Sequence, residues 1–219
     1  EFIEKCKNKE YVLKLGNRKD KGYRYYVGVD PAISTDGDYN VITVLEVDDE
    51  QNKAIVHVDR AKNIQFRENI EKIRLIGKVF EPEEILFETN TFAKAFTQEL
   101  KNMTDLNVRD FNTTRKKKQE IILNLQMNIE NQKIIIPYGD NASRRLSGAL
   151  VEELSMFSIT TSGRFEGVGA HDDLVMSLAL ANAASQGTGE QFILLDDLDI
   201  FDEPSTVRSS MSGILGLNF

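Results

Sequence analysis

The sequence predicts an α/β fold in which a mixed β-sheet is flanked by helices and the first three strands are antiparallel. Two observations indicate it: three β-branched runs follow one another with short turns between them, and helical and extended patterns alternate afterwards. We divide the 219 residues into an N-terminal segment over 1–22, interpreted as the remnant of a linker, a main domain over 23–186, and an acidic tail over 187–219. With 41% hydrophobic residues, such a main domain can bury a core of ordinary size.

The first three strands are predicted from runs of β-branched and aromatic residues. Arg24–Asp30 ends in an aspartate, and the turn-forming residues of Ser34–Asp38 separate it from Asn40–Val47. A second turn leads into Lys53–Arg60, so consecutive antiparallel pairing is expected. The residues expected to share one face of the third strand are Ala54, Val56 and Val58.

Helices and strands alternate in the rest of the chain. Apolar residues from Phe66 to Phe80 recur at three- and four-residue steps, which indicates an amphipathic helix ending near Pro82. The remaining expected segments are a strand at Glu84–Glu88, a helix over Thr91–Met103, a strand at Asn107–Phe111, a helix from Thr113 or Thr114 to Gln132, a strand at Lys133–Ile136, a helix from Asn141 or Ser143, a strand at Phe157–Thr161, a glycine-rich turn at Gly163–Gly169, a helix from His171 or Asp172 to about Ser185, and a peripheral strand within Gln191–Ile200.

Composition excludes several kinds of protein. The sequence has no apolar run of about 18 residues and no basic-then-apolar leader, so we expect a soluble protein without a membrane partner. The single cysteine, Cys6, can form neither an internal disulfide nor a zinc site by itself. A metal would therefore need oxygen ligands, with His57 and His171 as the only imidazoles.

The acidic charge of the chain is concentrated near its C-terminus. The net charge is −8, but residues 190–219 hold six acidic side chains against one basic side chain, a net of −5. The preceding residues therefore carry only −3, and divalent cations bound at a carboxylate cluster would reverse the local sign. The overall charge does not exclude nucleic-acid binding by the main domain.

Acidic residues stand where three predicted elements end or begin. Asp30 closes the first strand, Glu88 closes a later strand, and Asp172 and Asp173 open the last helix. If those two strands are parallel neighbours, their final carboxylates emerge at the same sheet edge, which the helix can also reach. Crowded carboxylates need a cation, and two Mg²⁺ or Mn²⁺ ions about 4 Å apart would serve phosphodiester hydrolysis.

Each acidic position also has a structural interpretation. A strand-end aspartate is often a turn residue, and Glu88 can mark the exit of its strand to solvent. Acids in the first turn of a helix stabilise its positive end, and this is the structural alternative for one of Asp172 and Asp173. The joint occurrence of all these positions in this order of elements favours the metal site.

Three segments occur in a diagnostic order between about Tyr23 and Ser185: YYVGVDPAISTDGDYNVITVL, ILFETNTFAKAFTQEL and GVGAHDDLVMSLALA. With these segments the sequence resembles the nuclease domain of the large terminase subunits of tailed phages. This resemblance implies a ribonuclease H-like fold and a nuclease that cuts DNA concatemers with divalent metal ions, Mg²⁺ or Mn²⁺, during genome packaging. The first ligand would be Asp30, the second Glu88, and the third Asp172 or Asp173, with a slight preference for Asp173. Possible supporting residues are His171, Asp36 and Asp38. The structural alternatives are a helix-entry role for His171 and turn formation for Asp36 and Asp38.

The resemblance also implies partners. Double-stranded DNA would be the substrate, and the host cytoplasm would be the place of action. The sequence contains no GxxxxGK[ST] loop, so the terminase ATPase domain would lie elsewhere in the full-length chain. The portal or procapsid and the small terminase subunit are further expected partners.

One basic cluster is a candidate for DNA binding. Arg115, Lys116, Lys117 and Lys118 open a predicted helix, where positive charge opposes the helix dipole and calls for another benefit such as phosphate contact. The alternative is a solvated helix face. Contacts to phosphates alone would suit a cut with little sequence specificity.

Other functions fit parts of the pattern. A Holliday-junction resolvase or another ribonuclease H-like nuclease would use the same carboxylate chemistry on a different nucleic acid. A sugar-kinase or actin-like ATPase begins with a similar strand and hairpin but needs phosphate-binding loops that the sequence does not show. A nonenzymatic DNA-docking module of the packaging motor would use the acidic residues only for structure.

Overall fold

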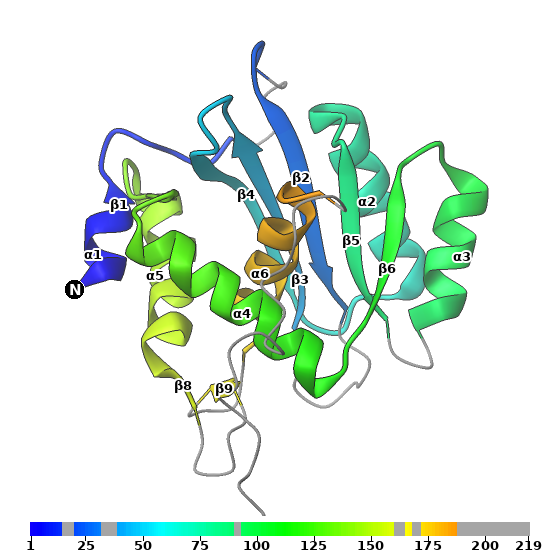
Figure 1. Cartoon of the computed structure of the whole chain (residues 1–219). Helices are drawn as coiled ribbons and strands as arrows, with labels where there is room; N and C mark the ends of the chain where they lie inside the picture. Colours follow the sequence, from blue (N-terminus) through cyan, green and yellow to red (C-terminus); the bar gives the residue numbers. More distant parts are fainter. Residues whose placement is uncertain (15–19, 32–38, 90–92, 160–164, 168–171, 188–219) are drawn as a thin grey trace, which may run out of the picture.

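A seven-stranded mixed sheet organises the part of the chain that the computed structural model describes (Figure 1). The strand order is β1-β7-β4-β3-β2-β5-β6, and a separate two-stranded sheet is formed by β8 and β9. Helices cover both faces of the larger sheet, so the predicted α/β architecture is confirmed. The described residues are 1–14, 20–31, 39–89, 93–159, 165–167 and 172–187.

The centre of the sheet is an antiparallel meander. Strands β2 (Arg24–Asp30) and β3 (Asn40–Val47) have the predicted bounds, and β4 (Lys53–Ala61) ends one residue later than expected. β2 pairs antiparallel with β3, and β3 pairs antiparallel with β4. The turn-separated β-branched runs therefore form the consecutive antiparallel strands that their pattern predicts.

Parallel strands extend this centre on both sides. β5 (Glu84–Thr89) is parallel to β2, and β6 (Val108–Asn112) is parallel to β5. On the other side β7 (Ile134–Pro137) is parallel to β4. As a result β2, β4, β5 and β6 all end, and β3 begins, at one edge, which we call the carboxyl edge.

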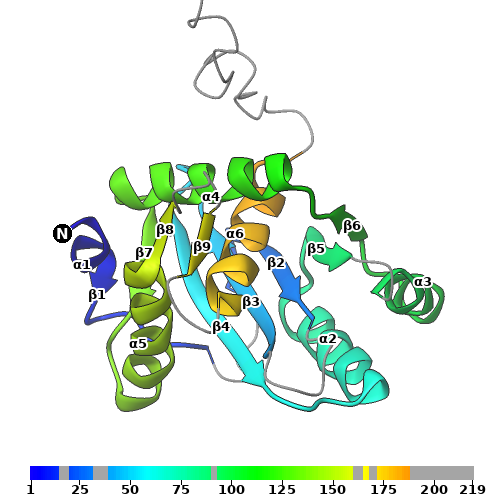
Figure 2. The ribbon, with the colours of Figure 1, turned by 90° about the horizontal axis from the view of Figure 1, so that it is seen from below.

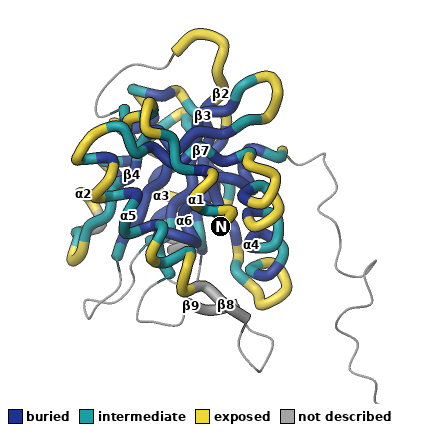
Figure 3. The backbone as a smooth tube through the Cα atoms, turned by 90° about the vertical axis from the view of Figure 1, so that its left-hand side faces the viewer, coloured by how far each residue is buried: buried dark blue, intermediate teal, exposed yellow. Residues whose placement is uncertain are grey.

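Helices form a layer on each face of the sheet. α2 (Phe66–Phe80) and α3 (Ala93–Met103) cover one face. α4 (Arg115–Glu130), α5 (Asn141–Met156) and α6 (Asp173–Ser185) cover the other. Figure 2, which views the sheet from its carboxyl edge, shows α6 between the sheet and α4. Burial along α6 is almost complete, as the dark tube in Figure 3 shows, so the helix is a core element of the fold.

A glycine in β2 allows α6 to lie directly on the sheet. A Cβ atom at Gly28 would lie 2.0 Å from the carbonyl oxygen of Ser177 and 2.4 Å from the amide nitrogen of Ala181. The Ser177 hydroxyl is 2.9 Å from the Gly28 carbonyl oxygen and 3.0 Å from the Thr43 hydroxyl. This contact fixes the start of α6 above the last residues of β2.

Two local features differ from the sequence prediction. A β-bulge between Val44 and Leu45 shifts the register against β4, so Val58 packs in the core below α6 while Ala54 and Val56 pack on the opposite face. β8 (Phe157–Ile159) pairs with β9 (Phe165–Gly167), which lies within the segment expected to be a glycine-rich turn. Three residues are too few for strand alternation to be visible in the sequence.

The N-terminal residues add to the sheet. α1 (Phe2–Cys6) leads into β1 (Lys7–Asn8), which pairs parallel with β7, and Cys6 and Leu13 are buried in the core. The amide of Leu13 donates to the hydroxyl of Ser143 at 2.9 Å. Residues 1–14, interpreted from the sequence as part of a linker, thus pack against the main domain. The sequence did not predict α1 and β1 because a one-turn helix and a two-residue strand show no detectable period. Among the described residues, no helix is both long and apolar enough to cross a membrane.

Candidate metal centre at the carboxyl edge

Asp30 is the last residue of β2, and Glu88 is the last but one residue of the adjacent parallel strand β5, on the same face of the sheet. Val29 and Phe87 are Cα partners across β2 and β5, so Asp30 and Glu88 occupy the next position of each strand. Side chains alternate between faces along a strand, and Gly28, two residues before Asp30, faces α6. The two carboxylates therefore project toward α6 at the carboxyl edge, as the sequence predicted.

The start of α6 brings two further carboxylates to this edge. Asp172 precedes the first helical residue, Asp173. The Asp172 carboxylate makes no hydrogen bond to the helix amides and instead pairs with the Lys118 ammonium at 2.8 Å. The Asp173 carboxylate accepts a hydrogen bond from the backbone amide of Tyr39 at 3.2 Å. Helix capping, the structural alternative for this pair, does not describe the contacts of Asp172.

Electrostatic repulsion among these acids is visible at Asp30. Asp30 keeps some accessible surface, but its carboxyl lies among protein atoms, and this loss of water is the largest cause that raises its pKa well above the usual range. Repulsion by Glu88 and a side-chain hydrogen bond to Glu88 raise the pKa further, followed by repulsion from Asp173 and then Asp172. The four acids therefore form one interacting group.

The donor set suits a hard divalent cation. All four side chains offer carboxylate oxygens, the ligands that Mg²⁺ and Mn²⁺ prefer, and a bound cation would relieve the repulsion that raises the pKa of Asp30. Among the described residues, no group of three or more acidic, histidine or cysteine side chains is spaced so that it could hold a metal ion in the present arrangement. The Lys118 ammonium pairs with Asp172, and the Tyr39 amide donates to Asp173. The donor chemistry of these residues therefore fits a divalent cation, but their present spacing does not form a coordination site.

An acidic residue of α5, Glu153, supports the start of α6. The Glu153 carboxylate accepts a hydrogen bond from the amide of Leu174 at 2.9 Å and forms an ion pair with Arg60 at 2.8 Å. Burial raises the pKa of Glu153, while Arg60 and the Leu174 amide oppose that shift. This pair ties β4 to the residue directly after Asp173.

Sequence reasoning missed three residues that contact the centre or its supports. The Thr113 hydroxyl donates to the Glu88 carboxylate at 2.6 Å from the residue that follows β6. The position of Thr113 directly after β6, which is parallel to β5, could have indicated that it lies near Glu88. Glu153 lies three residues after Leu150 on the buried side of α5, and Arg60 lies near the end of β4, but neither position by itself indicates a function.

The predicted basic cluster opens α4 beside the acids. Thr114 caps the helix by accepting a hydrogen bond from the Lys117 amide at 3.3 Å. Lys118 pairs with Asp172, and the Lys117 ammonium lies 5.9 Å from the ring centre of Phe111. The cluster Arg115–Lys118 is therefore at the carboxyl edge, where Lys118 has an acidic partner.

The remaining predicted residues divide into two groups. Asp36, Asp38 and His171 lie outside the described residues, as does the acidic tail from residue 188 onward. His57 lies within β4, 6.0 Å from the ring of Phe80 in α2, on the face opposite α6. Burial lowers the pKa of His57, so this imidazole belongs to the core rather than to the carboxyl edge.

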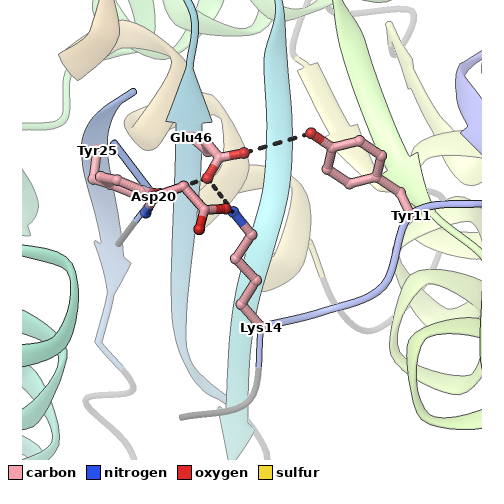
Figure 4. Close-up of polar contacts among 5 residues, drawn as sticks. All are labelled: Tyr11, Lys14, Asp20, Tyr25 and Glu46. Atoms are coloured by element: carbon pink, nitrogen blue, oxygen red, sulfur yellow. Dashed lines mark hydrogen bonds and ion pairs between the residues drawn. The ribbon is translucent and has the colours of Figure 1, made fainter. Parts of the chain in front are cut away.

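A different carboxylate cluster lies at the opposite end of β2 and β3. Glu46, which is 2% exposed, accepts a hydrogen bond from Tyr25 at 2.5 Å and forms an ion pair with Lys14, and Lys14 also pairs with Asp20 at 2.5 Å (Figure 4). Burial opposes the charge of Lys14, but its bonds to Asp20 and Glu46 outweigh this effect and raise its pKa. We call Tyr11, Lys14, Asp20, Tyr25 and Glu46 the Glu46 cluster. It borders a pocket of about 550 Å³ lined by Glu10, Tyr11, Val12, Lys14, Asp20, Tyr23 and Glu46.

Comparison with known sequences identifies relatives of the chain. The profile of the Terminase RNaseH-like domain matches residues 27–184. The large terminase subunit of Thermus virus P23-45 is 27% identical over 184 residues, which cover 79% of this chain and 34% of that protein. The chain thus spans about a third of the length of this curated relative.

Solved structures share the fold. The large terminase nuclease of thermophilic phage G20c superposes with a TM-score of 0.66 at 21% identity, covering 83% of this chain and 95% of that chain. The nuclease domain of the Thermus phage P74-26 large terminase gives 0.64 at 20% identity, with 85% and 95% covered. The large terminase of bacteriophage HK97 gives 0.60 at 11% identity, with 84% and 42% covered. These likenesses, with the family match, confirm the predicted ribonuclease H-like fold.

Proposed function

Because the chain belongs to the Terminase RNaseH-like domain family, we propose that it is a two-metal-dependent endonuclease that cuts double-stranded viral DNA concatemers during genome packaging, with little sequence specificity. The observation that carries this proposal is the grouping of Asp30, Glu88 and the Asp172–Asp173 pair at the carboxyl edge. Repulsion within this group has a reason if the acids serve to bind cations.

Mg²⁺ or Mn²⁺ is the proposed cofactor, held by Asp30, Glu88, Asp173 and Asp172. Structures of the G20c nuclease were solved with bound magnesium, cobalt and zinc, which supports divalent cation binding at this kind of domain. Divalent cations in such a site supply Lewis-acid stabilisation of a phosphodiester and of its leaving oxygen.

The protein groups would divide the work of holding this site. Thr113 donates to one oxygen of Glu88 and so orients that carboxylate. Lys118 already neutralises Asp172 through an ion pair at 2.8 Å, so we assign Asp173, the first residue of α6, as the principal ligand from that helix. Glu153 holds the adjacent helix residue, Leu174, in place.

The DNA contacts and partners are part of the same proposal. Arg115, Lys116, Lys117 and Lys118 would bind phosphates beside the acids, which places no demand on base sequence. The terminase ATPase domain, the portal or procapsid and the small terminase subunit are the proposed protein partners, and the host cytoplasm is the proposed place of action. We assign the nuclease to residues 23–186 and keep residues 187–219 as a separate acidic tail.

Plasmid cleavage by the purified chain tests this function. We expect cutting with Mg²⁺ or Mn²⁺ and none with a chelator. Asp30→Asn and Glu88→Gln should each lower the rate at least about 100-fold while the circular dichroism spectrum is kept, because each removes a charged ligand. Asp105→Asn, an exposed acid at the other end of the sheet, should cut at the parent rate.

Parent-like cutting by both Asp30→Asn and Glu88→Gln would refute the assigned centre. The substrate class is tested by comparing linear duplex with a four-way junction and an RNA–DNA hybrid. Preference for the junction or the hybrid would favour the alternative nucleases, and absence of cutting on every substrate would favour a docking module.

A further inference from the structure

Two cationic side chains lie against the ring of Tyr39 at the carboxyl edge. The Arg60 guanidinium lies 3.8 Å and the Lys62 ammonium 4.3 Å from the centre of the Tyr39 ring. The backbone amide of the same tyrosine donates to Asp173. This aromatic and basic surface is therefore attached directly to the candidate metal centre, from the β3 and β4 side.

The two cations differ in their acidic partners. Arg60 pairs with Glu153, so its charge is largely balanced within the fold. Lys62 is exposed, and no ion pair joins it to an acid among the described residues. Two positive charges held at one ring repel each other, and an anion bound beside Lys62 would reduce that repulsion.

Strand order places this surface opposite the basic turn of α4. Asp30 and Glu88 lie at the carboxyl ends of β2 and β5, within one residue of the strand end, and these strands lie between β4 and β6 in the sheet. Lys62 directly follows β4, whereas the α4 cluster follows β6. Four strand-to-strand steps of about 4.8 Å separate β4 from β6, roughly 19 Å, which corresponds to about six base-pair steps of duplex.

We propose that Tyr39, Arg60 and Lys62 form a second phosphate-binding surface that holds the backbone of duplex DNA across the metal centre from the α4 cluster. This inference rests on the proposed nuclease function. Lys62 supplies the charge that contacts a phosphate, while the ring of Tyr39 and the Arg60–Glu153 pair position it. With two cations over it, the ring is not free to stack on a base, so the contact is to the backbone and independent of sequence.

Duplex binding by a lysine variant tests the surface. All proteins carry Asp30→Asn so that the labelled linear duplex is not cut, and affinity is measured by fluorescence anisotropy over a series of salt concentrations. Lys62→Gln should weaken binding roughly 3- to 10-fold and reduce the slope of log K against log salt by about 0.9, the loss of one phosphate contact. Lys78→Gln, an exposed lysine near the end of α2, should change neither quantity.

Two further variants separate charge from structure. Lys62→Arg keeps the positive charge and should restore both affinity and salt slope. Tyr39→Leu removes the ring but keeps the amide that donates to Asp173, so it should weaken binding by loss of the positioning of Lys62. Changing the base sequence of the duplex should leave the effect of Lys62→Gln unaltered.

The outcomes distinguish this inference from the proposed function. If Lys62→Gln binds as tightly as Lys78→Gln while the parent chain still cuts duplex DNA, the second surface is refuted and the nuclease assignment stands. If Lys62→Gln and Lys78→Gln weaken duplex binding equally, DNA is attracted by the overall charge of the protein, and the proposed surface is also refuted. If the parent neither binds nor cuts duplex, the proposed function fails, and this inference fails with it.

Discussion

The two ends of β2 hold carboxylates in opposite electrostatic states. At one end Asp30 lies beside Glu88, and burial and repulsion raise its pKa. At the other end Tyr25 is the cross-strand partner of Glu46, which receives hydrogen bonds from Tyr25 and Lys14. The same hairpin thus carries one group of acids that lacks enough cations and one acid whose charge is fully compensated.

This difference separates a functional from a structural use of the same residue type. A compensated buried carboxylate serves the fold, because removing it would leave its buried partners without an acceptor. A group of carboxylates that repel one another lowers the stability of the fold. Proteins retain such groups where binding or catalysis requires them. The contrast gives the two clusters opposite expected responses to mutation.

Removing Glu46 should have the largest effect on stability. Glu46→Ala leaves Tyr25 and Lys14 without their shared acceptor in a buried place, so we expect a loss of about 3 kcal/mol in the free energy of unfolding. Denaturant titration measures it, with the exposed turn variant Glu50→Ala as control. Metal-dependent cutting by the folded fraction should persist, and its loss would break the separation between the two clusters.

A methyl group between the clusters should disturb both stability and cutting. Gly28→Ala places a Cβ against the backbone of Ser177, so α6 must shift, at a cost of about 2 to 3 kcal/mol. Because α6 carries Asp173, cleavage should slow as well. Gly148→Ala is the matched control, since its new Cβ would meet only the Tyr138 hydroxyl at 3.9 Å. Unchanged unfolding of Gly28→Ala would contradict the close contact of α6 with β2.

Neutralising the crowded end should stabilise the metal-free protein. Asp30→Asn removes one of the repelling charges, and we expect a gain of about 1 kcal/mol, or roughly 2–4 °C in Tm, in the presence of a chelator. The gain should shrink when Mg²⁺ is added, because only the parent keeps all its carboxylate ligands. A lower Tm for Asp30→Asn than for the parent with chelator would show that the charge of Asp30 is already balanced by its surroundings.

Alkaline pH should weaken the Glu46 cluster. Burial, followed by the hydrogen bond to Glu46, raises the pKa of Tyr25 to about 12, so the folded chain keeps a proton that the unfolded chain releases near pH 10. Stability therefore falls as pH rises from 10 toward 12, by on the order of 1 kcal/mol near pH 11 from Tyr25 alone. Tyr25→Phe should be less stable at neutral pH but show a shallower alkaline decline, measured by thermal unfolding. Parallel curves for parent and variant would contradict this role of Tyr25.

Local patterns predicted most of the elements because their residues carry clear periods. β2, β3 and α2 have the predicted bounds, and β2 and β5 are parallel neighbours as expected, although β5 ends at Thr89, one residue after Glu88. The N-terminal α1 and β1 and the short β9 were missed because so few residues show no period. The face of Val58 was predicted wrongly because a bulge depends on the pairing of two strands, which one strand's sequence does not reveal.

The sequence by itself determined the order of the elements, the acids at their ends and the family to which the chain belongs. Only the tertiary structure decided which groups these acids meet: Lys118 beside Asp172, Thr113 beside Glu88, and the Tyr39 amide beside Asp173. The physical reason is the distance along the chain over which each kind of interaction acts. Periodicity and turn chemistry act between near neighbours in the chain, whereas a carboxylate's charge state depends on every group that packing brings within a few ångströms of it.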